Sequence, residues 1–187
     1  MRHTIKKGIG VILVFFPAIV FSQVILKAGV AVGNRWNETL NSQTLGKGFR
    51  LTAEKFVARQ FSTGLGISYF SFNPNKSVKV RFNFYNLQAA YYFNTKRWQP
   101  YLGAGIGYTK YIDKTSIELA PGIFNTQKRE KNYSVISPYL GLKYNLNKAG
   151  KAGGFLQLNT DFVPSAATQP IGFISFEAGF VYKLQKL

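Results

Sequence analysis

Side chains that commonly carry acid–base, nucleophilic or metal chemistry are scarce in this sequence. There is no cysteine, and His3 is the only histidine among 187 residues. Hydrolases with a serine or cysteine nucleophile depend on a positioned base, most often histidine, and zinc sites are built mainly from thiolate and imidazole. The seven carboxylates show no metal-ligand spacing: Glu38, Glu54, Asp113, Glu118, Glu130, Asp161 and Glu177. We therefore expect no catalytic residue, no cofactor and no metal site.

The segment that contains His3 has the pattern of a secretory signal peptide. Arg2, Lys6 and Lys7 precede an apolar run over 8–21, and Ser22 follows it. A basic start, a short apolar run and a small residue at its end are typical of such signals. The run is short for the roughly 20 residues of a membrane-spanning helix, and it contains Pro17. We predict cleavage after residue 22, which leaves residues 23–187 as one domain without histidine.

The clearest structural signal lies between Trp98 and Ile112. Apolar side chains alternate there with glycine and polar residues, and one face carries Leu102, Ala104, Ile106 and Tyr108. Alternation with a period of two indicates a β-strand. The other face carries three glycines, which are costly in a strand unless bulky neighbours fill the space across from them. A barrel surrounded by lipid has apolar side chains on its outer face and small or polar side chains on its inner face, which is the pattern seen here.

Similar alternation recurs along the chain and predicts eight antiparallel strands, near 24–33, 48–60, 64–72, 78–93, 98–112, 134–146, 155–163 and 174–184. The fold class is therefore all-β, an eight-stranded up-and-down transmembrane β-barrel. The second strand competes with a short helix over 53–61, and Ser62 and Thr63 are expected to form the turn after it. The apolar phase of the fourth strand changes midway, which favours a bulge near Tyr85 or an upper half that rises above the membrane. Long extracellular loops are expected over 34–47 and 113–132.

The alternation also assigns side chains to the two faces of the barrel. Five charged residues are expected to face the lumen: Lys27, Glu54, Lys143, Asp161 and Glu177. We expect them to form an ion-paired plug and not a path for solutes. Besides the four residues of the fifth strand, the lipid-facing set includes Ile174, Phe176 and Phe180. Interfacial aromatics are expected at Phe93, Trp98, Tyr144 and Tyr182. The pattern leaves open whether Glu54 or Lys55 faces the lumen.

The chain resembles the eight-stranded outer-membrane β-barrel family typified by outer-membrane proteins A and X. The resemblance covers 24–184 and rests on the stretch Pro-Tyr-Leu-Gly-Ala-Gly-Ile-Gly-Tyr at 100–108 and on a last strand that ends in aromatics. It implies location in the outer membrane and transient contact with the barrel assembly machinery. The sequence departs from the family where residues 183–187 follow Tyr182, which displaces the terminal aromatic that serves as the insertion signal.

The net charge indicates anionic partners. It is +17 for the whole chain and +14 without the three cations of the predicted signal peptide. For an exported barrel we expect outer-membrane lipids and lipopolysaccharide phosphates as partners, with no nucleic acid, and a monomer. Binding through the two long loops would use Trp36 and Phe124 as contacts.

Two other functions are left open by the sequence. One is a soluble, lipocalin-like barrel with inverted faces, in which Leu102, Ile106, Phe176 and Phe180 line a cavity for an apolar ligand. The other is a narrow channel for small solutes, although eight strands enclose little more than their own side chains.

Overall fold

The computed structural model describes residues 24–36, 45–75, 77–94, 96–120, 123–146, 151–164 and 171–184. The predicted signal peptide lies outside them. The strands are β1 (Val24–Trp36), β2 (Leu45–Phe56), β3 (Phe61–Asn75), β4 (Val78–Tyr92), β5 (Trp98–Ala120), β6 (Ile123–Asn145), β7 (Ala152–Val163) and β8 (Ile171–Lys183). Within this part of the chain, no helix is long and apolar enough to cross a membrane.

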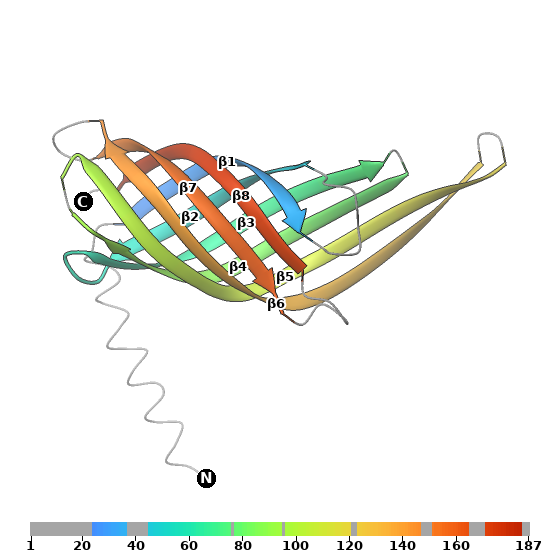
Figure 1. Cartoon of the computed structure of the whole chain (residues 1–187), viewed down its shortest axis with the longest axis horizontal. Helices are drawn as coiled ribbons and strands as arrows, with labels where there is room; N and C mark the ends of the chain where they lie inside the picture. The colour runs from blue at the N-terminus through green and yellow to red at the C-terminus, as the bar shows by residue number, and fades with distance from the viewer. Residues whose placement is uncertain are drawn as a thin grey trace, which may run out of the picture.

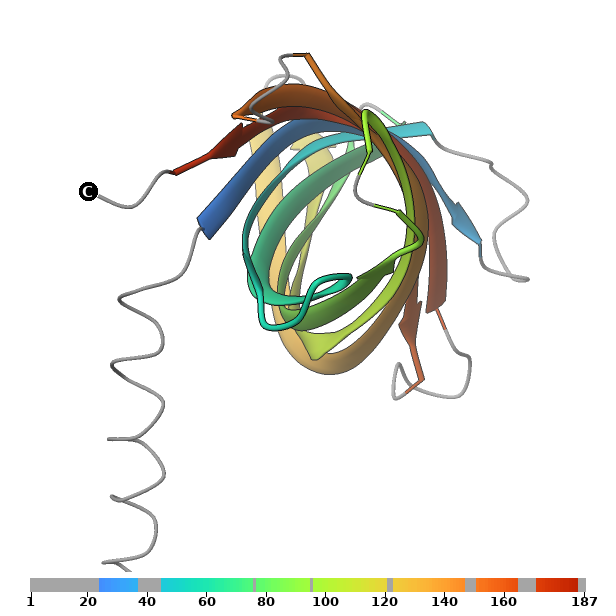
Figure 2. The ribbon, with the colours of Figure 1, turned by 90° about the vertical axis from the view of Figure 1, so that its left-hand side faces the viewer.

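The eight strands form a closed barrel in which each strand pairs with its neighbours in the sequence and β8 pairs with β1. All pairings are antiparallel, and the seam between β1 and β8 runs from Ile25 opposite Lys183 to Trp36 opposite Gly172. Figure 1 shows the strands tilted against the long axis, and Figure 2 shows them closing into a ring. Closure leaves no sheet edge in the barrel wall. The predicted fold class is confirmed.

Three details of the predicted strands are wrong. The turn after β2 lies at 57–60, and Ser62 and Thr63 belong to β3; the competing helix over 53–61 does not form. The register of β4 with β3 and with β5 runs without a shift through Tyr85, so there is no bulge near that residue. Instead Phe82 and Phe84 point into the barrel on the same face as Tyr92. The apolar phase changes because the lumen itself becomes apolar at that height.

The third correction concerns the predicted loop over 113–132. Most of it is a β-hairpin, because β5 and β6 stay paired from Trp98 opposite Tyr144 as far as Ala120 opposite Ile123. Pairing of β4 with β5 ends at Thr115, and pairing of β6 with β7 reaches no further than Ile136. The two strands therefore extend beyond the barrel wall, as Figure 1 shows at its right-hand end.

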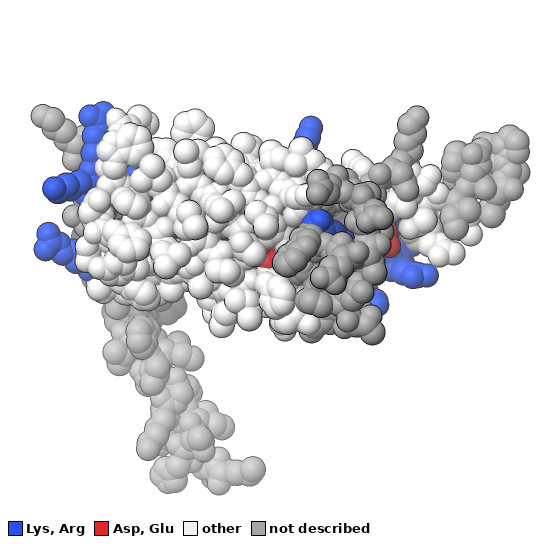
Figure 3. Space-filling view, viewed as in Figure 1, with Lys and Arg blue, Asp and Glu red and all other residues white. Residues whose placement is uncertain are grey.

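The outer wall has an apolar belt of the thickness of a membrane. Between Trp98 and Tyr108, the outward side chains of β5 are the exposed Pro100, Leu102, Ala104 and Ile106. Ten residue steps at about 3.3 Å, tilted by about 40°, span about 25 Å along the barrel axis. In Figure 3, lysine and arginine gather towards the two ends, and the middle of the visible face is almost free of them. This distribution matches a barrel whose middle is surrounded by hydrocarbon.

Candidate functional site

Two regions carry the polar chemistry of the molecule, namely the barrel lumen and the outer face of the β4, β5 and β6 ends. Among the described residues, the buried charged side chains of the lumen are three cations and three carboxylates: Lys27, Arg50, Lys143, Glu54, Asp161 and Glu177. Their formal charges balance, as burial of charge requires.

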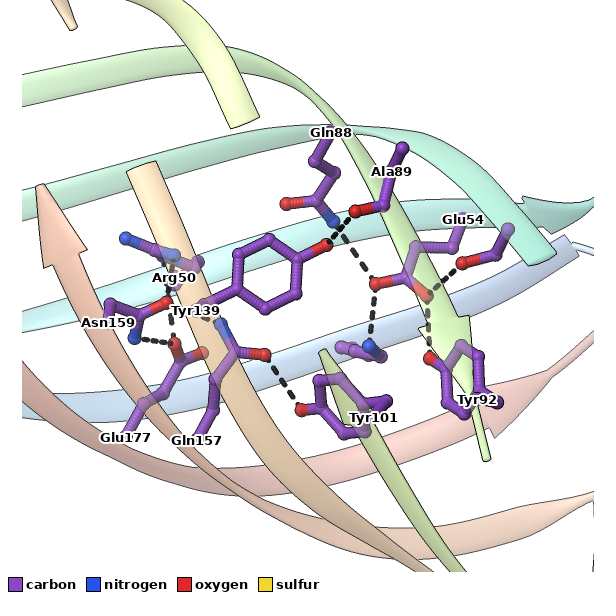
Figure 4. Close-up of polar contacts among 12 residues, drawn as sticks. Arg50, Glu54, Gln88, Ala89, Tyr92, Tyr101, Tyr139, Gln157, Asn159 and Glu177 are labelled. Carbon is purple, nitrogen blue, oxygen red and sulfur yellow. Dashed lines mark hydrogen bonds and ion pairs between the residues drawn. The ribbon is translucent and has the colours of Figure 1, made fainter. Parts of the chain in front are cut away.

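Glu54 is the centre of the first lumen cluster, shown in Figure 4. Its carboxylate accepts a hydrogen bond from Lys27 Nζ at 2.6 Å and further hydrogen bonds from Ser62 (3.2 Å), Gln88 (3.1 Å) and Tyr92 (2.8 Å). Lys27 also lies 4.4 Å above the centre of the Tyr101 ring. The carboxylate therefore has four donors in place of water, which is what keeps a buried charge stable.

Arg50 is the centre of the second cluster. Its guanidinium donates to Asn159 Oδ1 at 2.6 Å and forms ion pairs with Asp161 at 3.4 Å and Glu177 at 3.6 Å. Sequence analysis missed Arg50, although it has the same parity as Thr52 and Glu54 and so belongs to the same face of β2. The two clusters are linked through Gln157, which accepts from the Tyr101 hydroxyl at 2.7 Å and donates to Asn159.

The glycines predicted to face the lumen make room for two tyrosines. Gly103 lies opposite Tyr139, and Gly141 lies opposite Tyr101. In each pair the tyrosine ring covers the position that a Cβ of the glycine would occupy. In both pairs, an aromatic ring on one strand therefore fills the space left by the missing side chain of the glycine on the neighbouring strand. Such pairing restores the packing that a glycine in a sheet would otherwise lack.

Apolar layers lie on both sides of the polar clusters. Towards the hairpin end, five phenylalanines pack with valines and Ala31: Phe70, Phe72, Phe82, Phe84 and Phe173. Towards the end with the chain termini, Ile25, Phe155 and Val181 form a smaller cluster against Phe56. A polar solute that moved along the axis would have to pass two apolar layers and an ion-paired layer between them.

The structure places all five predicted lumen residues inside. Lys27, Glu54 and the Arg50 partners Asp161 and Glu177 meet in the two clusters. Lys143 is also buried, but no ion pair among the described residues joins it to a carboxylate; its Nζ lies 5.8 Å from the centre of the Tyr92 ring. Glu54 faces the lumen, while Lys55 belongs to the opposite face of β2, near its end.

The predicted lipid-facing side chains all lie on the outer wall. Their exposed fractions include 54% for Leu102, 63% for Ile106, 53% for Phe176 and 77% for Phe180, and Ala104, Tyr108 and Ile174 are exposed as well. These placements contradict the inverted, lipocalin-like arrangement, in which such residues would line a cavity. Phe93, Trp98, Tyr144 and Tyr182 lie near the end of the barrel that carries the short turns.

The second polar region, here called the basic patch, lies on the outer face where β4, β5 and β6 leave the apolar belt. Lys79 is opposite Lys114, and Lys114 is opposite Lys128. Alternation puts these three on the same face as Arg81 and Lys110. The stacked rings of Tyr85 and Tyr108, 4.8 Å apart, lie just below them at the edge of the belt.

Charge on the basic patch is only partly balanced. Glu130 accepts from Lys110 at 2.7 Å and from Lys128, and these two hydrogen bonds lower the pKa of its carboxyl to about 2. Five cations thus face one carboxylate on this surface. Like charges directly opposite each other destabilise a sheet, and the buried Arg81 Nε has no hydrogen-bond partner. The arrangement favours an added anion.

The two predicted loop contacts cannot be placed in this surface. Trp36 ends β1 and Phe124 lies near the start of β6, but their side chains are outside the described part of the chain. No cluster of three or more histidine, cysteine, aspartate or glutamate side chains suited to a metal ion occurs among the described residues.

The closed meander, the apolar outer belt and the polar lumen define an eight-stranded transmembrane β-barrel, which confirms the family resemblance at the level of the fold. Neisserial surface protein A is similar, with a TM-score of 0.65 at 15% identity over 86% of this chain and 97% of that one. The outer membrane protein OprG of Pseudomonas aeruginosa is also similar, with a TM-score of 0.58 at 16% identity over 88% of this chain and 96% of that one. The attachment invasion locus protein Ail of Yersinia pestis has a TM-score of 0.54 at 14% identity over 86% of this chain and 99% of that one.

The comparisons by sequence find no match. No family model matches the chain, and no curated protein matches it either. The solved structures therefore show the fold, while the activity has to be argued from this chain's own residues.

Proposed function

We propose that this chain is a non-enzymatic integral outer-membrane protein of a Gram-negative bacterium that acts at the cell surface and binds phosphorylated glycolipid. The observation that carries the proposal is the row of Lys79, Lys114 and Lys128 beyond the edge of the apolar belt. In a barrel with short periplasmic turns and longer extracellular segments, this row lies on the extracellular side, about 15 Å along the axis beyond Tyr85 and Tyr108, since six residue steps of about 3.3 Å are tilted by about 40°. The phosphates of lipopolysaccharide are the anions available there.

The barrel interior supports a surface role in preference to transport. Ion pairs and hydrogen bonds fill the middle of the lumen, and apolar layers lie on both sides. Eight strands leave no open channel once their side chains are packed. A solute in a narrow channel would therefore have to cross all three layers, and planar-bilayer recordings are expected to show no discrete openings.

The protruding β5–β6 hairpin supports a role in surface contact. Between residues 110 and 131 the sequence has five cations and three carboxylates, and side chains from Asn125 to Asn132 are exposed. A polyanion at the cell surface suits such a strand pair. Ail, which has the same fold, is described in complex with the heparin analogue sucrose octasulfate.

The test has a location arm and a binding arm. Location is tested by separating the membranes and comparing the gel mobility of boiled and unboiled protein, where a heat-dependent shift in the outer-membrane fraction is expected. Binding is tested with the refolded barrel and lipopolysaccharide, using wild type and the triple variant K79Q/K114Q/K128Q. We expect the triple variant to bind at least tenfold more weakly, with a shallower salt dependence, because charge-assisted hydrogen bonds each contribute about 1.5–3 kcal/mol.

The matched control removes three positive charges from the same end of the barrel but outside the row, in the variant K47Q/R129Q/K131Q, whose three cations are exposed. It is expected to bind almost as wild type does. An equal loss of affinity in both variants would show that the basic patch attracts lipopolysaccharide only through its net charge. If dephosphorylated lipopolysaccharide bound as tightly as the native form, phosphate recognition would be refuted.

A further inference from the structure

An open notch interrupts the outer wall near the end with the short turns. Outward side chains form a row across neighbouring strands, in which Trp98 faces Tyr144, Tyr144 faces Gly154, and Gly154 faces Phe180. A Cβ added to Gly154 would meet only one backbone oxygen, at 3.6 Å. The other glycines whose surroundings are described face the lumen, and each has a neighbour within 3.2 Å of that position. Gly154 is the one of these glycines on the outer wall, and its missing side chain leaves the notch between Tyr144 and Phe180.

The notch has the width of one hydrocarbon chain. Tyr144 and Phe180 are on strands two spacings apart, which is about 10 Å. A chain that packs about 4 Å from the atoms on each side needs about 8 Å. Phe180 is 77% exposed, the highest value among the large apolar side chains described. Its side chain therefore projects from the outer wall and forms one side of the notch, which is called the slot below.

A cation is held directly beside the slot. The Arg97 guanidinium lies 4.8 Å from the centre of the Tyr144 ring, and the Trp98 ring is 4.4 Å from Tyr144. The turn that carries Arg97 is fixed to β6, because the Arg97 carbonyl accepts from the Asn145 backbone N–H at 2.9 Å. A guanidinium stacked on an aromatic ring keeps its remaining N–H groups available for a phosphate.

The geometry points to a phospholipid-binding slot on the outer wall, in which Arg97 binds the phosphate of an anionic glycerophospholipid and one acyl chain lies over Gly154 between Tyr144 and Phe180. This inference rests on the proposed membrane location, and it concerns the end of the barrel opposite the basic patch. The turns at this end are periplasmic in such barrels, so the ligand is a phospholipid of the periplasmic leaflet.

The experiment measures lipid retention by the full refolded barrel in detergent, using native mass spectrometry with phosphatidylglycerol, phosphatidylcholine or glycerol phosphate. Wild type is expected to retain phosphatidylglycerol in preference to phosphatidylcholine and to ignore glycerol phosphate, since the headgroup alone lacks the chain. Gly154→Leu fills the slot, and Arg97→Gln removes the cation. Arg97→Gln is expected to lower phosphatidylglycerol retention about tenfold, the size of one lost charge-assisted contact. Gly154→Leu is expected to lower it by a similar factor, because about two methylene groups of the acyl chain lose their buried position.

Matched controls keep the result specific to the slot. Ala104→Leu adds three of the same four carbons at another exposed position of the outer wall, and Arg59→Gln removes an exposed cation from another turn at the same end. Both are expected to bind as wild type does, and folding of every variant is checked by heat-dependent gel mobility. Unchanged retention in Gly154→Leu, or equal loss in the controls, would overturn the slot. A wild-type chain that forms the barrel yet holds both lipids equally refutes the slot alone, whereas a chain that never forms a detergent-embedded barrel refutes the proposed function.

Discussion

Replacement of Glu54 by leucine tests whether the lumen charges stabilise the barrel as a connected network. Lys27, only 3% exposed, would lose its carboxylate partner at 2.6 Å, and Ser62, Gln88 and Tyr92 would lose their acceptor. Breaking one side of a buried ion pair costs about 3–5 kcal/mol because the other charge stays buried. We expect Glu54→Leu to lower the free energy of unfolding by about that amount.

The double variant K27M/E54L separates charge burial from packing. It removes both charges and leaves only the neutral donors of Ser62, Gln88 and Tyr92 without an acceptor. Each lost acceptor costs about 1 kcal/mol of stability, so the double variant is expected to be more stable than Glu54→Leu alone. Unfolding by urea in lipid vesicles can be followed by the fluorescence of the two tryptophans, Trp36 and Trp98, and by gel mobility. Lys131→Gln, which removes an exposed lysine, is the control and is expected to behave as wild type.

Two results would refute this account of the lumen. One is a Glu54→Leu variant within about 1 kcal/mol of wild type, since a buried, unpaired ammonium must cost more than that. The other is a double variant less stable than the single one, which would mean that the lysine needs no partner.

Three further predictions follow from the wall, the lumen and the hairpin. Leu102→Arg, near the middle of the apolar belt, is expected to destabilise the barrel in vesicles by about 2–4 kcal/mol, and an unchanged unfolding midpoint would contradict a lipid-facing wall. Gly103→Val puts bulk where the Tyr139 ring lies and is expected to cost about 1–3 kcal/mol; Gly154→Ala, which has room, serves as its neutral control. Because two lysine hydrogen bonds hold the pKa of Glu130 at about 2, its ion pairs should persist above pH 4 and be lost as the pH falls through about 2. The midpoint, read from the carboxyl carbon by NMR, should move up towards 4.5 in high salt, and a midpoint near 4.5 at low salt would show that the pairs do not form in solution.

Alternation with a period of two was sufficient to predict the strand number and the faces of most strands. In the middle of β5, β7 and β8 the large apolar side chains are mostly outward, so the parity of Leu102 or Phe176 identifies the lipid side, although Phe155, Phe173 and Val181 are apolar and face the lumen. In β4 this logic fails, because Phe82 and Phe84 are apolar and yet face inward. Sequence alone does not distinguish a hydrocarbon solvent from an apolar layer in the lumen. Of the two interpretations of the phase change, the bulge is wrong, whereas Lys79 and Arg81 on the outer face agree with the other, in which this half of β4 rises above the membrane.

The hairpin and Arg50 were missed for different reasons. Residues 113–132 are polar and charged, which is typical of a loop, but cross-strand pairing with a long partner keeps them extended. Arg50 is at the start of the predicted second strand, where an assignment is least secure, and its partners Asn159 and Glu177 lie more than a hundred residues away. The basic patch depends on register between β4, β5 and β6, so no single stretch of sequence contains it.

The lumen network also bears on how the barrel is completed. Arg50 comes from the second strand, whereas two of its acceptors, Asn159 and Glu177, come from the seventh and the last. Until the last strand is paired, the guanidinium lacks Glu177, one of its two carboxylate partners. Ring closure therefore completes the charge balance of the lumen at the same step that removes its water, which favours the fully closed barrel over partly paired forms.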